Sequence, residues 1–219
     1  MRTTLQVTAA PATLPVGLGI TKRHCRIDHA SDDDLLQVYI GVATSMAEQY
    51  LSRVLITQTL LWTVTPEWPV RPDVHFLRGA LQLPRAPVQS IASVVLTDQR
   101  GNATTIVPAT LPIVPPAALQ GYVVDLSQQP ATLVVGLDTI LVDGRTVRNA
   151  TLQHLQVQFV AGYGTPTDND PFVAAIPEPI KQAILLTIAH LYEHRGDSDA
   201  AMPRAAEWLL DPYRIPWVA

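Results

Sequence analysis

Apolar residues near the start of the chain recur at helical spacing. The run Ser31-Asp32-Asp33-Asp34 is typical of a helix start, because Ser31 or Asp32 can cap free backbone N–H groups and the carboxylates complement the positive helix end. Two adjacent apolar rows follow it: Leu35, Tyr39, Val42, Met46 and Tyr50, and beside them Leu36, Ala43, Ala47 and Leu51. This spacing predicts a long helix with a broad buried face, after a shorter helix that opens at residues 14–16 and ends near His24.

From about residue 55 to 163 the pattern changes to the alternation of half-buried strands. Residues 57–64 alternate threonine with apolar side chains, and residues 153–159 alternate polar residues with Leu155, Val157 and Phe159. Further strands are predicted at 88–97, 122–126 and 132–135, turns at 98–101 and 143–144, and a proline-rich loop at 108–116. The middle of the chain is therefore predicted to be β-rich.

The last quarter of the chain returns to helical spacing. Pro177 and Pro179 suit a first helical turn, where a missing N–H costs nothing. One stripe then contains Ile180, Ile184, Ile188 and Leu191. We expect this helix to stop at Gly196, a second short helix at 203–210, and an extended tail over 213–219.

The order of helices, strands and helices predicts an α+β fold. We expect a small helical bundle, made by the long N-terminal helix and the C-terminal helices, with an inserted β-rich domain and an extended C-terminal tail. The predicted boundaries are 1–54 for an N-terminal arm and the helical part of the body, 55–165 for the inserted domain, 166–211 for the helices that complete the body, and 212–219 for the arm.

Composition limits the classes of function. Of the 219 residues, 47% are hydrophobic and 16% charged, so a sizeable core leaves apolar surface for partners. The formal net charge of −4 argues against general affinity for nucleic acid, which needs clustered Lys and Arg. Cys25 is the one cysteine, so no intrachain disulfide can form. No apolar run approaches the length of a membrane span, and the first residues lack a signal core.

One motif could support catalysis. His190, Glu193 and His194 match H-x-x-E-H, in which two histidines four apart on a helix can bind zinc. The motif lies in a last helical turn, where the helix dipole favours histidine and arginine in any case, and a third ligand would have to come from elsewhere. We interpret it as a helix end and predict no catalytic residue, no cofactor and no metal, with a zinc hydrolase as the alternative.

The C-terminal tail carries the residues most enriched at interface hot spots. These are Tyr213, Arg214 and Trp217, and the prolines Pro212 and Pro216 lower the entropy lost on docking. Two interpretations stay open: the tail packs on its own domain, or it docks on a partner.

Short sequence pieces spread over most of the chain resemble one family in their order and spacing. They are Ala10-Pro11, Pro15-Val16, Arg26-Ile27-Asp28, Ala47-Glu48-Gln49-Tyr50 with Arg53, Leu83-Pro84-Arg85-Ala86-Pro87-Val88, Ser93-Val94, Asp98 before Gly101, Ala161-Gly162-Tyr163-Gly164, Ile176-Pro177, Ile180-Lys181-Gln182-Ala183, and His190-Leu191-Tyr192-Glu193 before Arg195. The chain resembles the head-tail connector (adaptor) proteins of tailed bacteriophages and gene transfer agents, of the phiE125 gp8-like and gp6-like type. Two stretches, 110–120 and 137–150, depart from the compact family pattern.

The resemblance implies a structural virion protein at the head-tail interface, assembled in the host cytoplasm, and not an enzyme. Its implied partners are the portal protein, neighbouring copies in a ring of about twelve, and a tail-side connector or tail terminator protein. Such a ring would extend the DNA channel and enclose DNA without sequence-specific binding, with no membrane involved. In related connectors the C-terminal segment engages the portal, which points here to Tyr213, Arg214, Ile215 and Trp217. The alternatives are a tail-completion or tail-terminator protein and a DNA-packaging accessory factor.

Overall fold

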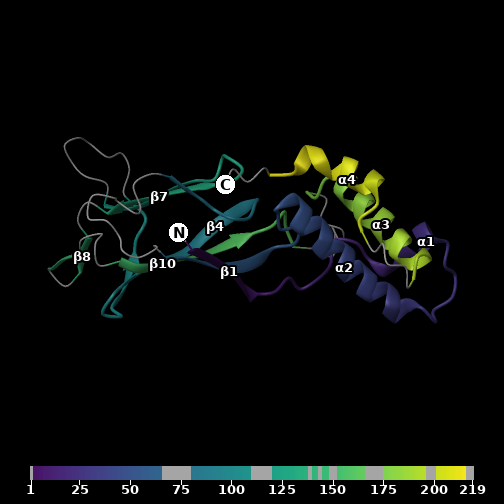
Figure 1. The fold of residues 1–219 in the computed structure, drawn as a ribbon, viewed down its shortest axis with the longest axis horizontal. Coiled ribbons are helices and arrows are strands. Elements are labelled where there is room, and N and C mark those ends of the chain that lie inside the picture. The colour runs from purple at the N-terminus through teal and green to yellow at the C-terminus, as the bar shows by residue number, and fades with distance from the viewer. Residues whose placement is uncertain are drawn as a thin grey trace. The chain divides into compact units, whose positions relative to one another are not determined.

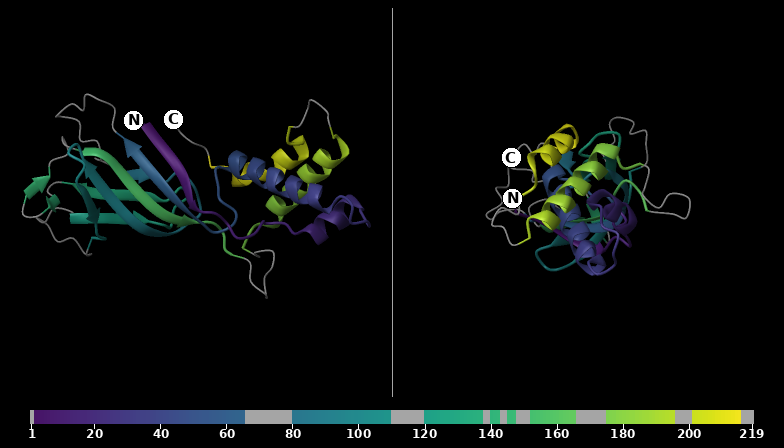
Figure 2. Two further views of the ribbon diagram at one scale, coloured as in Figure 1. Left: turned by 90° about the horizontal axis from the view of Figure 1, so that it is seen from below. Right: turned by 90° about the vertical axis from the view of Figure 1, so that its right-hand side faces the viewer.

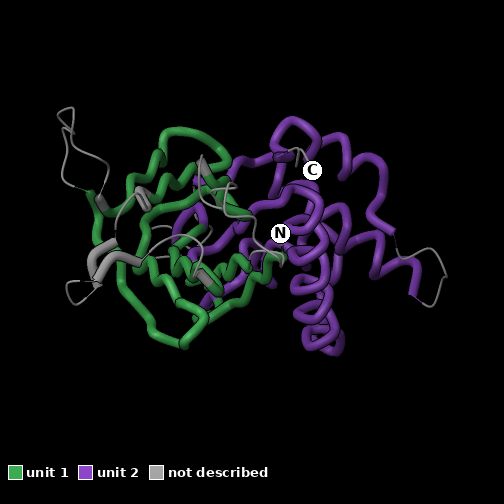
Figure 3. The backbone as a smooth tube through the Cα atoms, turned by 60° about the vertical axis from the view of Figure 1, so that its left-hand side comes forward, with its two compact units in different colours: residues 1–10, 58–161 green, residues 11–57, 162–219 purple. Residues whose placement is uncertain are grey.

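The protein has a mixed α/β fold, as the sequence predicts (Figure 1; Figure 2 gives two further views). The computed structural model describes residues 2–65, 80–109, 120–137, 140–142, 145–147, 152–165, 175–195 and 201–215. The chain divides into two compact units, each built from two separate stretches (Figure 3). Unit 1 comprises Met1–Ala10 and Gln58–Ala161, and unit 2 comprises Pro11–Thr57 and Gly162–Ala219.

Unit 1 contains the described strands. They are β1 (Arg2–Ala9), β2 (Gln58–Thr65), β3 (Ala80–Gln82), β4 (Val88–Asp98), β5 (Ala103–Ile106), β6 (Gln120–Asp125), β7 (Thr132–Leu137), β8 (Ile140–Val142), β9 (Arg145–Val147) and β10 (Leu152–Ala161). They form one sheet of order β1-β2-β10-β4-β5, a second sheet of order β3-β7-β6, and a third of β8 and β9. Neighbouring strands in each of these sheets are antiparallel.

The alternation predicted for β2 and β10 is confirmed. Leu60, Trp62 and Val64 of β2 are buried and stand opposite Phe159, Val157 and Leu155 of β10, respectively. On the other side of β10, Leu155 faces Leu96 and Val157 faces Val94 of β4. Because directly paired residues project from the same face of a sheet, these side chains make one continuous apolar face.

The other predicted strands are found as β4, β6 and β7. The turn after β4 is also confirmed: the Gly101 N–H donates to the Asp98 carbonyl over 3.0 Å, and Gly101 has a φ of +85°. Residues 143–144, the second predicted turn, lie outside the described residues. The predicted loop at 108–116 also lies outside the described residues, except for residues 108 and 109. Of these, Pro108 forms a parallel bridge with Tyr122.

Strand β1 was not predicted from the sequence. It pairs with β2 from Arg2 opposite Thr65 to Ala9 opposite Thr59, whereas the sequence interpretation assigned residues 1–54 to an arm and the helical body. Every residue of β1 except Leu5 is exposed, so burial leaves no alternation to recognise. Backbone pairing holds the strand in place, assisted by the Thr8 hydroxyl, which donates to the Thr59 carbonyl over 3.1 Å.

Unit 2 contains the described helices. They are α1 (Leu18–Cys25), α2 (Asp33–Leu51), α3 (Glu178–Glu193), α4 (Arg204–Leu210) and the 3-10 turn η2 (Asp211–Tyr213). The four predicted helices are therefore present, although α1 begins at Leu18 rather than at residues 14–16. Helix α3 starts as expected, with Pro179 in its first turn, whereas Gly196 lies outside the described residues. None of the described helices has the length and apolar content that crossing a membrane requires.

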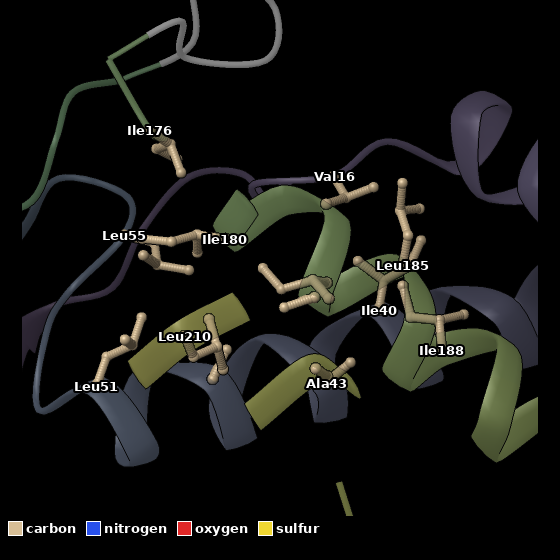
Figure 4. Packing of buried hydrophobic residues seen from close by; sticks show 14 of the residues in the cluster. Val16, Ile40, Ala43, Leu51, Leu55, Ile176, Ile180, Leu185, Ile188 and Leu210 are labelled. Atoms are coloured by element: carbon tan, nitrogen blue, oxygen red, sulfur yellow. The ribbon is translucent and has the colours of Figure 1, made fainter. Parts of the chain in front are cut away.

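The core of unit 2 joins α2 to α3 and α4 (Figure 4). Its buried members are Val16, Leu36, Ile40, Ala43, Ala47, Leu51, Leu55, Ile56, Ile176, Ile180, Ala183, Ile184, Leu185, Ile188, Ala206 and Leu210. The buried face of α2 therefore consists of Ile40 and the second apolar row predicted from the sequence, which is Leu36, Ala43, Ala47 and Leu51. The first row was predicted to be buried as well, but it is only half-buried and Val42 exposes 42% of its surface. The difference arises because α3 packs on the side of α2 that carries the second row.

The predicted side-chain cap of α2 was wrong. Asp32 occupies the N-cap position but makes no capping hydrogen bond with its side chain, and the Ser31 hydroxyl lies 2.7 Å from His29 Nδ1 instead. The Asp32 carboxylate is held by Tyr192 in the last turn of α3 and by Arg195, two residues after the helix ends. Contacts between residues about 160 positions apart thus replace the local cap.

Two distant stretches of unit 2 lie side by side after α2. The Tyr163 N–H donates to the Leu55 carbonyl over 3.0 Å, and the Thr57 N–H donates to the Gly164 carbonyl over 2.9 Å. Gly162 adopts a φ of +135°, and a Cβ atom added to it would lie 2.5 Å from the Thr57 backbone nitrogen. This approach requires glycine, because any side chain would meet backbone atoms that cannot rotate away.

We expect Gly162→Ala to lower the free energy of unfolding by about 3 kcal/mol, since it combines an unfavourable φ with a backbone overlap. Gly41→Ala in the middle of α2 is the matched control. A Cβ atom there would meet nothing within 4 Å, so this change should stabilise the protein by about 0.5–1 kcal/mol. Thermal and urea unfolding measure both, and equal stabilities would contradict the proposed role of Gly162.

Candidate interaction surface

The C-terminal end of α2 holds the C-terminal segment of the chain. The Tyr50 hydroxyl donates a short hydrogen bond to the Asp211 carboxylate. Arg53 Nε donates to the Tyr213 carbonyl over 2.6 Å, and the Ile215 N–H donates to the Leu51 carbonyl over 3.1 Å. Three consecutive contacts therefore fix the chain from η2 to residue 215 against one helix end.

Tyr50 is the centre of this arrangement. Its hydrogen bond to the Asp211 carboxylate raises the pKa of the Tyr50 hydroxyl, because ionisation would place two negative charges together. The guanidinium carbon of Arg214 lies 5.0 Å from the centre of the Tyr50 ring, within the range of a cation–π interaction. Tyr50 thus contacts the segment on both sides of Tyr213.

A shallow hollow of about 410 Å³ opens beside these contacts. It is lined by Met46, Gln49, Tyr50, Ser52, Met202, Arg214 and Ile215. Methionine side chains adapt to different apolar shapes, and Arg214 brings a positive charge to the lining. A hollow of this chemistry can receive an apolar side chain of another molecule, with an acidic group nearby.

The predicted partner-binding residues that the structure describes differ in their exposure to solvent. Ile215 is buried with 5% of its surface exposed, Tyr213 is half-buried, and Arg214 is exposed. Trp217 lies outside the described residues. The predicted extended arm was wrong for its first two residues, because Pro212 and Tyr213 belong to η2. The described start of the tail packs on its own unit, whereas docking of the tail on a partner stays a prediction.

A second cluster ties the start of α2 to the end of α3. The Tyr192 hydroxyl and Arg195 Nη2 both donate to Asp32 Oδ2, the latter over 3.0 Å. The Arg195 guanidinium carbon also lies 4.0 Å from the centre of the Tyr192 ring. The hydrogen bond from Tyr192, followed by that from Arg195, lowers the pKa of the Asp32 carboxyl.

The histidines of the H-x-x-E-H motif stack on each other at the end of α3. The ring centres of His190 and His194 are 4.4 Å apart, and His194 Nδ1 lies 3.0 Å from the His190 carbonyl oxygen. Within the described part of the chain, no three His, Cys, Asp or Glu side chains gather so that they could hold a metal ion.

Burial, with a smaller effect of Glu193, raises the pKa of the Cys25 thiol.

Comparison with known proteins supports the resemblance stated above. The model of the phage gp6-like head-tail connector protein family matches residues 18–105, so the recognition of this family from the sequence is confirmed. Among curated proteins, none matches the chain.

Several solved structures share the fold over nearly the whole chain. A chain in the virion of a native gene transfer agent particle is 22% identical, with a TM-score of 0.66 and coverage of 98% of this chain and 97% of its own. A chain in the neck of an empty gene transfer agent particle, computed with C6 symmetry, is 21% identical, with a TM-score of 0.65 and coverage of 99% and 97%. A chain in the neck of a native particle, computed with C12 symmetry, is 22% identical, with a TM-score of 0.62 and coverage of 99% and 97%.

Sequence reasoning missed the residues that hold the tail. Tyr50, Arg53 and Asp211 were recognised as parts of a helix or of the family pattern, but not as contacts of the C-terminal segment. No local signal could reveal them, because Tyr50 and Asp211 are 161 residues apart.

Replacing Asp32 with asparagine tests the second cluster. A carboxyl whose pKa is lowered by folding stabilises the folded state above the pKa of the unfolded chain, and this stabilisation is lost as pH falls through the folded pKa. Asp32→Asn should therefore melt below the wild type at pH 7, and the gap should shrink as pH falls below the ordinary Asp value of 3.8. Asp34→Asn, at an exposed position of the same helix turn, is the control. A gap independent of pH would contradict the assignment.

Proposed function

We propose that this chain is a head-tail adaptor of a phage or phage-like virion, a structural protein and not an enzyme. Copies of the chain form a ring, with twelve as the expected number, under the portal. The ring extends the DNA channel and offers the docking surface for tail-side proteins. The observation that carries this proposal is the shared fold over 97% or more of the length of chains in gene transfer agent particles.

Three further observations support the adaptor role. The region that matches the connector family, residues 18–105, includes α1 and α2 as well as the strands β2 to β4, so it is not limited to one short motif. One of the similar chains belongs to a particle neck computed with C12 symmetry, which agrees with the ring size proposed here. The formal net charge of −4 suits a channel wall that DNA must pass without being gripped.

Within this role, we assign the helical unit to the body of the ring, and Gln58–Ala161 of the β-rich unit to an insertion in it. Each unit has a sizeable core of its own, which agrees with this assignment. The C-terminal tail is the portal-binding element, through Tyr213, Arg214, Ile215 and Trp217. The exposed Arg214 is suited to direct contact, whereas the buried Ile215 anchors the tail so that it leaves the body at a fixed point.

Mixing the purified full-length protein with its cognate portal ring tests the adaptor role. We expect a stoichiometric ring of this protein to add to the portal, visible as added mass in light scattering and as a new tier in negative-stain electron microscopy. Failure to associate, at concentrations where both proteins are soluble, would reject the portal-adaptor role in favour of a tail-side completion protein.

Substitutions separate docking of the tail from its packing. Arg214→Glu and Trp217→Ala should each weaken portal binding by about tenfold or more, because Arg and Trp are frequent hot-spot residues. Arg214→Glu should lower the melting temperature only slightly, since Arg214 is exposed and its contact with the Tyr50 ring is a surface cation–π interaction. Ile215→Ala is the contrasting variant and should lower the melting temperature, because it removes a buried side chain. Portal binding unchanged in both Arg214→Glu and Trp217→Ala would refute the tail assignment.

A further inference from the structure

Unit 2 leaves apolar side chains exposed on two of its helices. Val38 and Val42 of α2 expose 61% and 42% of their surface, and Trp208 of α4 exposes 69%. Val38 and Val42 are one helical turn apart, so they lie on one face of α2. Single exposed apolar residues are common, but an exposure of this extent is unusual for a side chain as large and apolar as tryptophan.

The two faces point away from a core that both helices share. Trp208 lies across α4 from Ala206 and Leu210, which are buried in the cluster of unit 2. Val38 lies across α2 from Leu36 and Ile40, which are buried in the same cluster. Helix α3 packs extensively against both helices (Figure 1), whereas α2 and α4 approach each other mainly where Tyr50 reaches Asp211. The outer faces of α2 and α4 are therefore distinct surfaces of the unit.

Each face carries one charged residue one turn before its apolar residue. Asp34 precedes Val38 by four positions on α2, and Arg204 precedes Trp208 by four positions on α4. Both charged residues are exposed, and neither side chain has a hydrogen bond or ion pair to another residue that the structure describes. The α2 face thus combines apolar and negative groups, and the α4 face combines apolar and positive groups.

We propose that the α4 face of one copy, Arg204 and Trp208, docks on the α2 face of the next copy, Asp34, Val38 and Val42. This proposal rests on the ring that the proposed function requires. A cyclic ring of more than two copies needs a head-to-tail contact, in which two different surfaces of the chain meet and repeat by rotation. The two faces supply such a pair, with an aromatic anchor on an apolar strip and opposite charges beside it.

The directions of the helices agree with this pairing. Within one copy, α2 and α4 run in the same sense (Figures 1 and 2), and Tyr50 near the end of α2 binds Asp211 just after α4. Rotation about a ring axis preserves the sense of each helix along that axis. Arg204 can then meet Asp34 while Trp208 meets Val38 and Val42. In its own copy, α4 lies beside the C-terminal half of α2, whereas the proposed contact pairs it with the N-terminal half of α2 in the next copy. Since rotation does not change the height of a residue along the ring axis, the pairing also implies that α2 and α4 are tilted relative to that axis.

A disulfide trap in the full-length protein tests the contact directly. The background carries Cys25→Ser, and Val42→Cys is combined with Trp208→Cys. Because Trp208→Cys removes the aromatic anchor, the trap is run at a protein concentration at which Trp208→Ala still forms rings on the portal. After ring assembly and mild oxidation, we expect a ladder of covalent oligomers that extends toward the closed ring. The matched control combines Trp208→Cys with Gln182→Cys, at an exposed position of α3, and should give no ladder.

The outcomes separate this proposal from the one on which it rests. A ring on the portal without a ladder, or with an equal ladder in the control, would overturn the α2–α4 contact and leave the adaptor role standing. No ring in the Cys25→Ser parent or in the wild type would overturn both. A ladder specific to the Val42 and Trp208 pair supports the contact.

Charge exchange and truncation give an independent readout. Asp34→Arg and Arg204→Asp should each weaken ring assembly on the portal, and the double variant should recover much of the loss, since it restores opposite charges. Trp208→Ala should raise the concentration for half-maximal ring assembly about thirtyfold, as expected for a hot spot. Val107→Ala, which alters a residue 67% exposed in unit 1, is the control and should have no effect. No effect of Trp208→Ala, or no recovery in the double charge variant, would count against the contact.

Discussion

Burial of α2 against α3 is the constraint on which unit 2 depends. The two helices come from stretches of the chain separated by more than a hundred residues, yet they share one apolar cluster that also receives α4. Backbone hydrogen bonds between residues 55–57 and 163–164 close the unit where the chain returns to it, and Gly162 permits the close approach. The cluster supplies apolar burial, and these hydrogen bonds fix how the two stretches align.

The same helix end that completes the core also determines where the C-terminal tail leaves the unit. Tyr50, Leu51 and Arg53 hold residues 211–215 in place, and Ile215 is buried. A tail anchored in this way loses less conformational entropy on docking than one that is mobile from α4 onward. The tail proposed to bind the portal would thus begin at a defined position in every copy of the ring.

The structure assigns different roles to residues that look equivalent in the sequence. Asp32, Asp33 and Asp34 form one acidic run, but Asp32 binds Tyr192 and Arg195, Asp33 pairs with Lys22 over 2.7 Å, and Asp34 faces outward. The aromatic residues Trp62 and Trp208 differ in the same way, since one is 4% and the other 69% exposed. The outward-facing members of each set are those available to partners.

The sequence by itself determined the positions of the four helices, the alternation in β2 and β10, and the resemblance to head-tail connectors. These features depend on local spacing, which burial on one face imposes on a helix or strand. Only the tertiary structure decided which row of α2 is buried, that the exposed residues 2–9 form a strand, and that Asp32 binds α3 instead of capping α2. Each of these three features depends on contacts with residues far away in the chain, and the spacing of nearby residues does not predict such contacts.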